Sequence, residues 1–461
     1  MTRKFSTLRH PNKKHCFNII FDMKILFITV GGSPQPILTS VGSLKPDRVV
    51  FICSDGPKGS QSQIIGEGKP CEVRQGSEVV ESLPNIPTQL GLGDKFDPDR
   101  DVILVSNPDD LSECYGKIAL KVREARNNNA NVELLADYTG GTKTMSVALA
   151  QVALDDKLET YVTSSTRQNV VKVERGERVR RATTSAVTVE RTISQVLPAF
   201  LRQYNYPAAI AELETLLQER ELSGDNVNRV QLWLDCCMGF DLWDRFDHAE
   251  AWLYLQNYLK YPQLREPILF LKRVMGSREA FAPATEDNFT APESIKGHGY
   301  EIVEDVLLNA ERRAILARYD DAVARLYRAL ELLEQVRLWE AYGIKTGDVD
   351  LEKLPETVRP QYETSRSPAG KIQLPLFRAY TLLQAFPDDP IGKLFESSVN
   401  RIQNALQVRN YSILAHGLRP VTKSDYRQLE AAIAPFIREA IASVVSEKSS
   451  SLVQFPQHWE I

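Results

Sequence analysis

Short apolar runs alternate with helical patterns along residues 23–182, and this alternation limits the possible folds more than any other feature of the chain. Each run is apolar and rich in β-branched residues, as expected of strands buried on both faces of a sheet. The runs span residues 24–30, 49–53, 102–106, 132–136 and 160–163, and helical patterns between them span residues 111–126 and 143–154. The pattern predicts an α/β domain whose parallel sheet is covered by helices.

Small polar residues follow the predicted strands. Open parallel sheets bind ligands at the carboxyl ends of their strands, near the point where the strand order reverses. The stretch DYTGGTKTMS at residues 137–146 is the most distinctive, because its backbone N–H groups, hydroxyls and ammonium group meet at a predicted helix start and suit an anion. The candidate ligand-binding residues at these strand ends are Gly31, Gly32, Ser33, Ser54, Ser106, Asn107, Thr139, Gly140, Gly141, Thr142 and Lys143.

The glycine-rich stretch has two interpretations. It is not a Walker A loop, because Gly-Lys-Ser/Thr with a glycine five residues upstream is absent. Gly31-Gly32 is not a G-x-G-x-x-G fingerprint either, so no dinucleotide cofactor is predicted. Either the stretch binds an anionic ligand, or its glycines turn a strand–helix corner and Lys143 is solvated. The local pattern alone favours neither.

Helical patterns dominate the rest of the chain. Residues 183–300 contain two Ala-rich amphipathic stretches, at 206–217 and 246–258, and are predicted to form a helical linker domain. Residues 301–461 are predicted to form an all-α bundle, with helices at 301–318, 320–340, 375–384, 392–415 and 423–445. The segment 343–371 is rich in Pro, Asp and Glu and is predicted to be an exposed insertion.

Arg409 and His416 are the candidate catalytic pair of the helical region. Two helical turns separate them, so on a continuous helix they project from nearly the same face, about 10 Å apart. Gly417 is predicted to end that helix as its C′ residue, which leaves His416 beside the negative helix end, where an imidazolium is stabilised. Asn410 and Ser412 complete the predicted catalytic set as orienting or substrate-contacting residues.

These motifs resemble those of known families. The sequence RNYSILAHG at residues 409–417, with RYDDAVARLYRALE at residues 318–331, resembles a HEPN ribonuclease domain. Residues 23–182, with their glycine pair at 31–32 and the DYTGGTKTMS stretch, resemble a Rossmann-like CARF domain. The order CARF, helical linker, HEPN is similar to that of the stand-alone accessory ribonucleases of type III CRISPR systems. The resemblance covers residues 23 to about 445.

The resemblance implies a function. CARF domains dimerise and bind a cyclic oligoadenylate made by the CRISPR effector complex, and HEPN domains dimerise so that paired Arg/His motifs form one site that cleaves RNA. It therefore implies a homodimeric endoribonuclease that cleaves single-stranded RNA in antiviral defence, with cyclic oligoadenylate as its allosteric activator. Because RNA supplies its own 2′-OH nucleophile, we expect His416 to be a general acid/base and Arg409 to stabilise phosphate charge. No carboxylate cluster accompanies the pair, so we expect neither a metal nor another cofactor.

Two other functions remain open. The chain could be a ligand sensor whose HEPN domain is only a scaffold, although intact Arg409 and His416 argue against this. It could instead be a ring nuclease whose CARF domain degrades the cyclic ligand, which Ser33, Thr139 and Lys143 would allow without demanding it. Surface contacts are the expected role of the nearby Arg318, Tyr327 and Arg328.

Composition limits the remaining possibilities. The 461 residues are 25% charged and 43% hydrophobic with a formal net charge of −4, which excludes wholesale disorder and nucleic-acid binding through bulk positive charge. No run of about 18 apolar residues occurs, so no membrane span is expected. The six cysteines are scattered without a C-x-x-C, which favours the reducing cytoplasm over a disulfide framework or zinc site. Residues 1–22 are basic and patternless, and are expected to be a mis-assigned start or a disordered extension.

Overall fold

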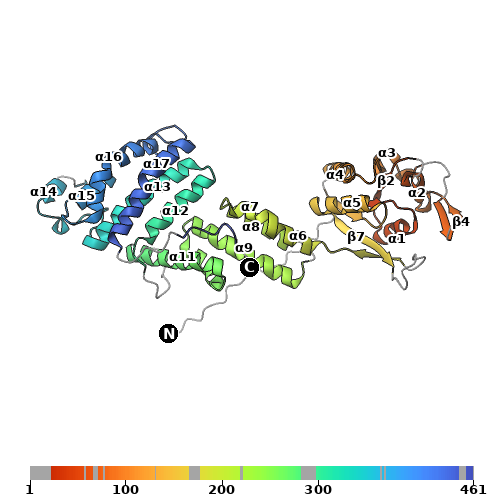
Figure 1. Cartoon of the computed structure of the whole chain (residues 1–461), viewed down its shortest axis with the longest axis horizontal. Coiled ribbons are helices and arrows are strands. Elements are labelled where there is room, and N and C mark those ends of the chain that lie inside the picture. Colours follow the sequence, from red (N-terminus) through yellow and green to blue (C-terminus); the bar gives the residue numbers. More distant parts are fainter. Residues whose placement is uncertain are drawn as a thin grey trace. The chain divides into compact units, whose positions relative to one another are not determined.

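The computed structural model of the chain separates into two compact units, Met1–Thr184 and Ser185–Ile461 (Figure 1). The helices predicted as a linker at 183–300 therefore lie in the same unit as those predicted at 301–461. The predicted N-terminal extension lies outside the described residues, apart from Asp22. The structure describes residues 22–56, 59–65, 71–75, 78–129, 131–165, 177–218, 222–281, 297–363, 366–367, 370–445 and 453–459.

The first unit is built on a six-stranded sheet in the order β5-β2-β1-β6-β7-β8. Its strands are β1 (Met23–Thr29), β2 (Arg48–Ser54), β5 (Val102–Val105), β6 (Val132–Asp137), β7 (Glu159–Ser165) and β8 (Glu177–Arg181). The first five strands in this order pair in parallel, and β8 pairs antiparallel with β7. The predicted parallel sheet is confirmed.

Helices cover both faces of this sheet, because alternate side chains of its strands point in opposite directions. In β1, Ile25 and Phe27 pack against α4 (Leu111–Asn127) and α5 (Lys143–Asp155). The intervening Leu26 and Ile28 pack on the other face, in the cluster that includes Ile37 of α1 (Gln35–Leu44). The remaining elements of the unit are η1 (Ser60–Gln63), α2 (Ile86–Gln89), η2 (Gly93–Lys95), α3 (Pro98–Asp101), and the two-stranded sheet of β3 (Cys71–Gln75) and β4 (Glu78–Leu83).

The regular secondary structure that the second unit's described residues form in named elements is all helical. Its first half contains α6 (Ser185–Arg191), a π-helical turn η3 (Thr192–Val196), α7 (Leu197–Leu201), α8 (Tyr206–Leu217), α9 (Gly224–Asp244), α10 (His248–Leu255), η4 (Gln256–Tyr258) and α11 (Pro262–Phe281). Its second half contains α12 (Glu301–Ile315), α13 (Tyr319–Tyr342), η5 (Leu351–Lys353), α14 (Arg359–Glu363), α15 (Leu376–Gln384), α16 (Pro390–Asn410) and α17 (Lys423–Val444).

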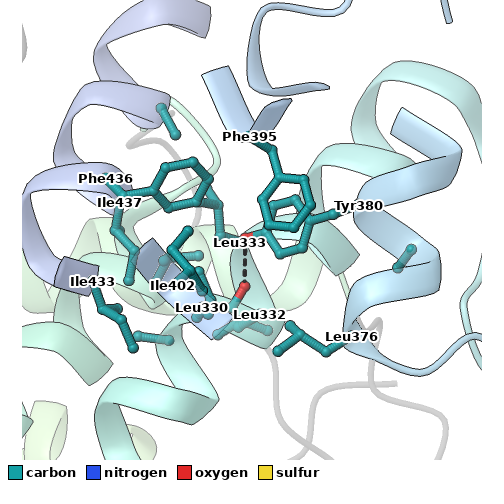
Figure 2. Close-up of a cluster of buried hydrophobic side chains, with 14 of the residues drawn as sticks. Leu330, Leu332, Leu333, Leu376, Tyr380, Phe395, Ile402, Ile433, Phe436 and Ile437 are labelled. Carbon is teal, nitrogen blue, oxygen red and sulfur yellow. Dashed lines mark hydrogen bonds between the residues drawn. The ribbon is translucent and has the colours of Figure 1, made fainter. Parts of the chain in front are cut away.

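The bundle core of the second half is aromatic at its centre. Tyr380 of α15 stacks on Phe395 of α16 with ring centroids 4.4 Å apart, and Phe436 of α17 meets both rings edge-on. The buried Tyr380 hydroxyl donates a hydrogen bond of 2.8 Å to the carbonyl of Leu330 in α13 (Figure 2). This contact gives the hydroxyl, which is buried away from water, a hydrogen-bond partner within the protein. It also links α15 to α13.

A second core joins the first half of this unit to residues 453–459. Phe455 packs against Trp243 of α9 with ring centroids 4.5 Å apart, and Trp459 stacks on Trp233 at 5.1 Å. The fully buried Arg312 of α12 lies 3.7 Å from the centre of the Phe455 ring. Arg312 also donates to Asp244 at 2.8 Å. This aromatic and charged cluster packs the predicted linker helices against α12.

Two expectations about the helical unit are wrong. The segment 343–371 is not simply an exposed insertion, because its Ile344, Leu354 and Tyr362 side chains are buried in the bundle core. The helix predicted at 392–415 ends at Asn410, five residues early.

His248, which has no partner at metal spacing in the sequence, is buried and hydrogen-bonded to Asp305 at 3.0 Å.

Candidate functional site

The predicted ligand loops meet where the strand order reverses. In the sheet, β2 lies next to β1 on one edge and β6 lies next to β1 on the other edge. The chain continues from β1 to β2 and returns later to β6, so the strand order reverses between β1 and β6. A Cβ on Gly31 would lie 2.9 Å from the Gly141 nitrogen, and one on Gly140 would lie 2.5 Å from the Thr29 carbonyl oxygen. Glycine is therefore required because the two loops touch through their backbones. Packing alone explains these glycines.

Asp137 anchors the glycine-rich loop from beneath. It is fully buried at the end of β6, and its Oδ2 accepts hydrogen bonds from Ser40 at 2.7 Å and from Thr163 at 2.9 Å. Its Oδ1 accepts from both the backbone N–H, at 3.0 Å, and the hydroxyl of Thr139. The Thr139 hydroxyl in turn accepts from the Thr163 N–H at 2.6 Å. Because a hydroxyl has one donor and that of Thr139 is used, Thr139 holds the loop in place.

Three other predicted ligand-binding residues, Ser106, Asn107 and Ser54, already form hydrogen bonds within the protein. The backbone N–H groups of Ser106 and Asn107 donate to the Glu113 carboxylate at 2.8 and 2.9 Å. The Lys117 ammonium, together with these two N–H groups, lowers the pKa of Glu113 to about 2. A permanent carboxylate therefore occupies the amides that a phosphate would need. The Ser54 hydroxyl likewise accepts from the Ser60 N–H at 2.9 Å.

Lys143 places an exposed positive charge at this edge of the sheet. It is exposed, it is the first residue of α5, and no carboxylate in the described part of the chain pairs with it. Thr142 caps the same helix, accepting from the Met145 N–H at 3.2 Å and donating to the Pro108 carbonyl at 2.7 Å. The positive end of α5 and the Lys143 ammonium thus act in the same direction on an anion. Gly32 and Ser33 are exposed on the neighbouring loop.

In the second unit, a compact turn replaces the predicted helix after Arg409. Ser412 organises this turn: its N–H and hydroxyl donate to the Arg409 carbonyl at 3.0 and 2.8 Å. Its own carbonyl accepts from the N–H groups of Ala415 and Gly417 at 3.0 and 3.1 Å. Arg409 therefore lies in the last turn of α16, whereas His416 lies in the turn that follows. The predicted two-turn helical spacing of the pair is wrong.

Gly417 has a different role from the one predicted. It does not cap a helix in a left-handed conformation; the C-cap residue of α16, directly after its last residue Asn410, is Tyr411. A Cβ on Gly417 would lie 2.0 Å from the Tyr411 carbonyl oxygen, so a side chain is excluded by the backbone itself. The Arg419 N–H closes the turn with a hydrogen bond of 3.2 Å to the same oxygen. This contact folds the segment that carries His416 back onto the end of α16.

The side chains of the motif differ in their exposure and in their contacts with the rest of the protein. Arg409 is half-buried, with its guanidinium carbon 4.3 Å from the centre of the Tyr327 ring and its Nη1 3.3 Å from Asn410 Oδ1. The His416 imidazole is exposed and has no hydrogen-bond partner among the described residues. Ser412 is only 2% exposed. Its predicted catalytic role therefore gives way to a structural one, because its hydroxyl is bonded to backbone.

Comparison with known proteins identifies the region that holds this motif. Residues 292–439 match the family model of the Csm6 HEPN domain, and Arg409 and His416 both lie within them. The segment that carries the motif is therefore similar to a Csm6 HEPN domain. The solved structure of Enterococcus italicus Csm6 bound to cyclic hexa-2′-fluoro-hexa-dAMP matches with a TM-score of 0.52 at 13% identity, over 92% of this chain and 94% of that one. That match shows a shared fold. No curated protein matches the chain significantly in sequence.

The surface around the motif carries several exposed apolar side chains. Tyr411, Ile413, Leu414 and Leu418 are 65%, 58%, 56% and 88% exposed, respectively. Soluble monomers rarely expose several large apolar side chains side by side, and such patches commonly mark interfaces. We call these four residues the apolar patch.

Sequence reasoning missed two residues that shape the candidate sites. Asp137 is marked in the sequence by an acidic residue at the end of an otherwise apolar strand, directly before the glycine-rich stretch. Tyr327 was expected to make only surface contacts, whereas its ring lies against Arg409. Arg328 does form the expected surface pair, with Glu331 at 2.7 Å.

The described residues contain neither a metal-binding cluster nor a helix suited to a membrane. Among the described residues, no three or more His, Cys, Asp or Glu side chains are grouped so as to hold a metal ion. In the same residues, no helix is both long and apolar enough to cross a membrane.

Proposed function

We propose that this chain is a cyclic oligoadenylate-activated endoribonuclease of type III CRISPR defence. The observation that carries the proposal is the paired Arg409 and His416, held at one end of α16 within residues that match the Csm6 HEPN domain. Arg409 lacks a carboxylate partner among the described residues, and His416 is exposed. Both are therefore available to a phosphodiester. The proposed compartment is the cytoplasm, where free thiols such as the buried Cys236 and Cys237 stay reduced.

The proposed reaction needs only proton transfer and charge stabilisation. The RNA 2′-OH loses its proton to a general base and attacks the adjacent phosphorus, the bond from phosphorus to the 5′-oxygen breaks, and that oxygen gains a proton. The products are a 2′,3′-cyclic phosphate and a 5′-OH. An imidazole can carry out such proton transfers near neutral pH, and His416 is the candidate. The Arg409 guanidinium stabilises the extra negative charge on the phosphorane oxygens. The proposed mechanism requires no metal ion.

The active form is proposed to be a homodimer. The apolar patch surrounds the motif, so a second copy that covers it would bring a second Arg409 and His416 to the same place. An isologous interface does this by symmetry, because each copy presents the same residues to the other. The composite site would then contain two imidazoles, one for each proton transfer. Burial of the patch supplies the hydrophobic driving force for association.

The proposed activator site is the switch-point edge of the N-terminal sheet. The Enterococcus italicus Csm6 structure was solved with a cyclic oligoadenylate analogue bound. In this chain, the start of α5 with its exposed Lys143 is the part of that edge best suited to phosphate. The activator and RNA sites lie in different units, so the ring would act by shifting a conformational equilibrium.

The substitution Lys143→Ala tests the activator site. We expect the concentration of cyclic oligoadenylate needed for half-maximal RNA cleavage to rise about tenfold or more, because a charge-assisted contact is lost. The weak cleavage rate without ligand should stay unchanged. Calorimetry and cleavage assays measure both effects. The matched control is Lys157→Ala, which removes an exposed ammonium just beyond the opposite end of α5. If both variants respond like the wild type, the glycine-rich loop is a structural corner.

A further inference from the structure

Arg409 is held by an aromatic ring instead of a carboxylate. Its guanidinium carbon lies 4.3 Å from the centre of the Tyr327 ring, within the range of a cation–π contact. Tyr327 projects from α13, packs against the buried bundle core and is half-buried. The Tyr327 hydroxyl has no hydrogen-bond partner among the described residues. The face of the ring is therefore the part of Tyr327 that meets Arg409.

This arrangement has a chemical consequence. A carboxylate partner would neutralise the guanidinium and occupy its N–H groups, which are the groups that bind phosphate. An aromatic face attracts the cation through its quadrupole and contacts only the flat side of the guanidinium. Among the described residues, the only hydrogen-bond partner of the N–H groups along the edge is Asn410, which lies 3.3 Å from Nη1. The ring thus orients the charge without reducing it.

Neighbouring residues keep carboxylates away from this contact. Glu331, one turn along α13 from Tyr327, pairs with Arg328 at 2.7 Å. Arg328 also donates to Gln335 at 3.0 Å, so its side chain stays along the surface of α13. No carboxylate of the described residues forms an ion pair with Arg409.

We propose that Tyr327 is a positioning residue for Arg409, whose ring face fixes the plane of the guanidinium so that its free N–H groups meet the scissile phosphate. This inference rests on the proposed ribonuclease function. It assigns the effect to the aromatic face and not to the hydroxyl. Loss of the ring should lower kcat and leave KM nearly unchanged, because Arg409 acts on charge that develops in the transition state.

The test uses the full chain at saturating cyclic oligoadenylate. Tyr327→Leu should lower kcat for RNA cleavage about 2- to 30-fold with little change in KM, the range expected for loss of a cation–π contact. Tyr327→Phe, which keeps the ring, should retain the wild-type kcat. In an Arg409→Ala background, Tyr327→Leu should cause no further loss, because the residue through which it acts is absent.

The matched control is Tyr319→Leu. Tyr319 is on the same helix, two turns before Tyr327, and its ring lies 5.9 Å from that of Tyr426 in a tilted arrangement, so Tyr319→Leu removes another half-buried ring from α13. It should leave kcat unchanged. A Tyr327→Leu loss that persists without Arg409, or that Tyr327→Phe shares, would overturn the positioning role.

A spectroscopic measurement separates this inference from the ribonuclease function. In NMR spectra of the full chain, the ring current of Tyr327 should shift the side-chain signals of Arg409 upfield. Tyr327→Phe should keep that shift and Tyr327→Leu should abolish it. Unchanged Arg409 signals in Tyr327→Leu would contradict the contact whether or not the chain cleaves RNA. An inactive wild type with the ring-current shift intact would instead contradict the proposed function.

Discussion

Replacing His416 with alanine should lower the rate of RNA cleavage about 10²- to 10⁴-fold, the usual contribution of a general acid/base. Binding of cyclic oligoadenylate should not change, because the predicted ligand loops are in the other unit. The fold should also persist, since the imidazole is exposed and makes no hydrogen bond with described residues. Single-turnover cleavage, calorimetry with the ring and thermal unfolding measure the three properties.

The control for this variant is His458→Ala, which removes another exposed imidazole outside the 409–417 segment. It should cleave RNA at the wild-type rate. A His416→Ala protein that remains folded, binds the ring and still cleaves at more than about a tenth of the wild-type rate would mean that another group transfers the protons.

A second large effect is expected from Glu334, a buried acid of α13. Its side chain is fully buried, and neither carboxylate oxygen has a hydrogen-bond partner in the described part of the chain. Burial raises the pKa of Glu334 to about 9, the negative charge of Glu331 adds to this effect, and Arg328 opposes it. Tyr380 also lies within electrostatic range, with its own pKa raised chiefly by burial. The folded protein therefore holds Glu334 neutral at pH 7.

The sign of the pH effect follows from proton counting. Between the ordinary glutamate pKa of 4.5 and about 9, the folded state keeps a proton that the unfolded state releases. The free energy of unfolding should therefore fall as pH rises through this window, by up to about 1.4 kcal/mol per pH unit for one proton. Glu334→Gln removes that dependence, so its thermal stability should exceed that of the wild type by an amount that grows from pH 5 to pH 8.

Thermal unfolding of both proteins at several pH values checks this prediction. Glu340→Gln is the matched control, because Glu340 is on the same helix but is exposed, and it is not among the charges that shift the pKa of Glu334. The thermal stability of this control relative to the wild type should not increase from pH 5 to pH 8. Parallel pH profiles for Glu334→Gln and the wild type would show that Glu334 is ionised in the folded protein.

The sheet was predictable because its strands are apolar on both faces. Each predicted strand and the helices at 111–126 and 143–154 lie within two residues of the observed bounds. The strands β3, β4 and β8 were missed, because their sequences, CEVRQ, EVVESL and ERVRR, are short and polar and lack the apolar runs of a central strand.

The end of α16 was not predictable from periodicity. Tyr411 and Leu414 continue an apolar helical spacing, yet both are exposed and belong to the apolar patch. An apolar residue at an interface looks the same in sequence as one in a core. The turn instead depends on the backbone contact between Gly417 and Tyr411, which is visible only once the segment is folded.

The candidate ligand site was predictable in place but not in detail. Topology brings the strand ends together, as the alternating pattern implies. The hydrogen bonds that commit Thr139 to Asp137 and Thr163 join residues up to 24 positions apart. No local motif reveals such partners, so hydroxyls that look available in the sequence prove to be occupied in the fold.

The most direct test of the proposed function is cleavage of single-stranded RNA by the purified full chain in EDTA, with and without added cyclic oligoadenylate. We expect slow cleavage without the ring, faster cleavage with it, and products that carry a 2′,3′-cyclic phosphate and a 5′-OH. The fate of the ring is followed in the same reaction by chromatography. RNA left intact under all conditions, cleavage that requires a divalent metal, or loss of the ring without any cleavage of RNA would contradict the proposed function.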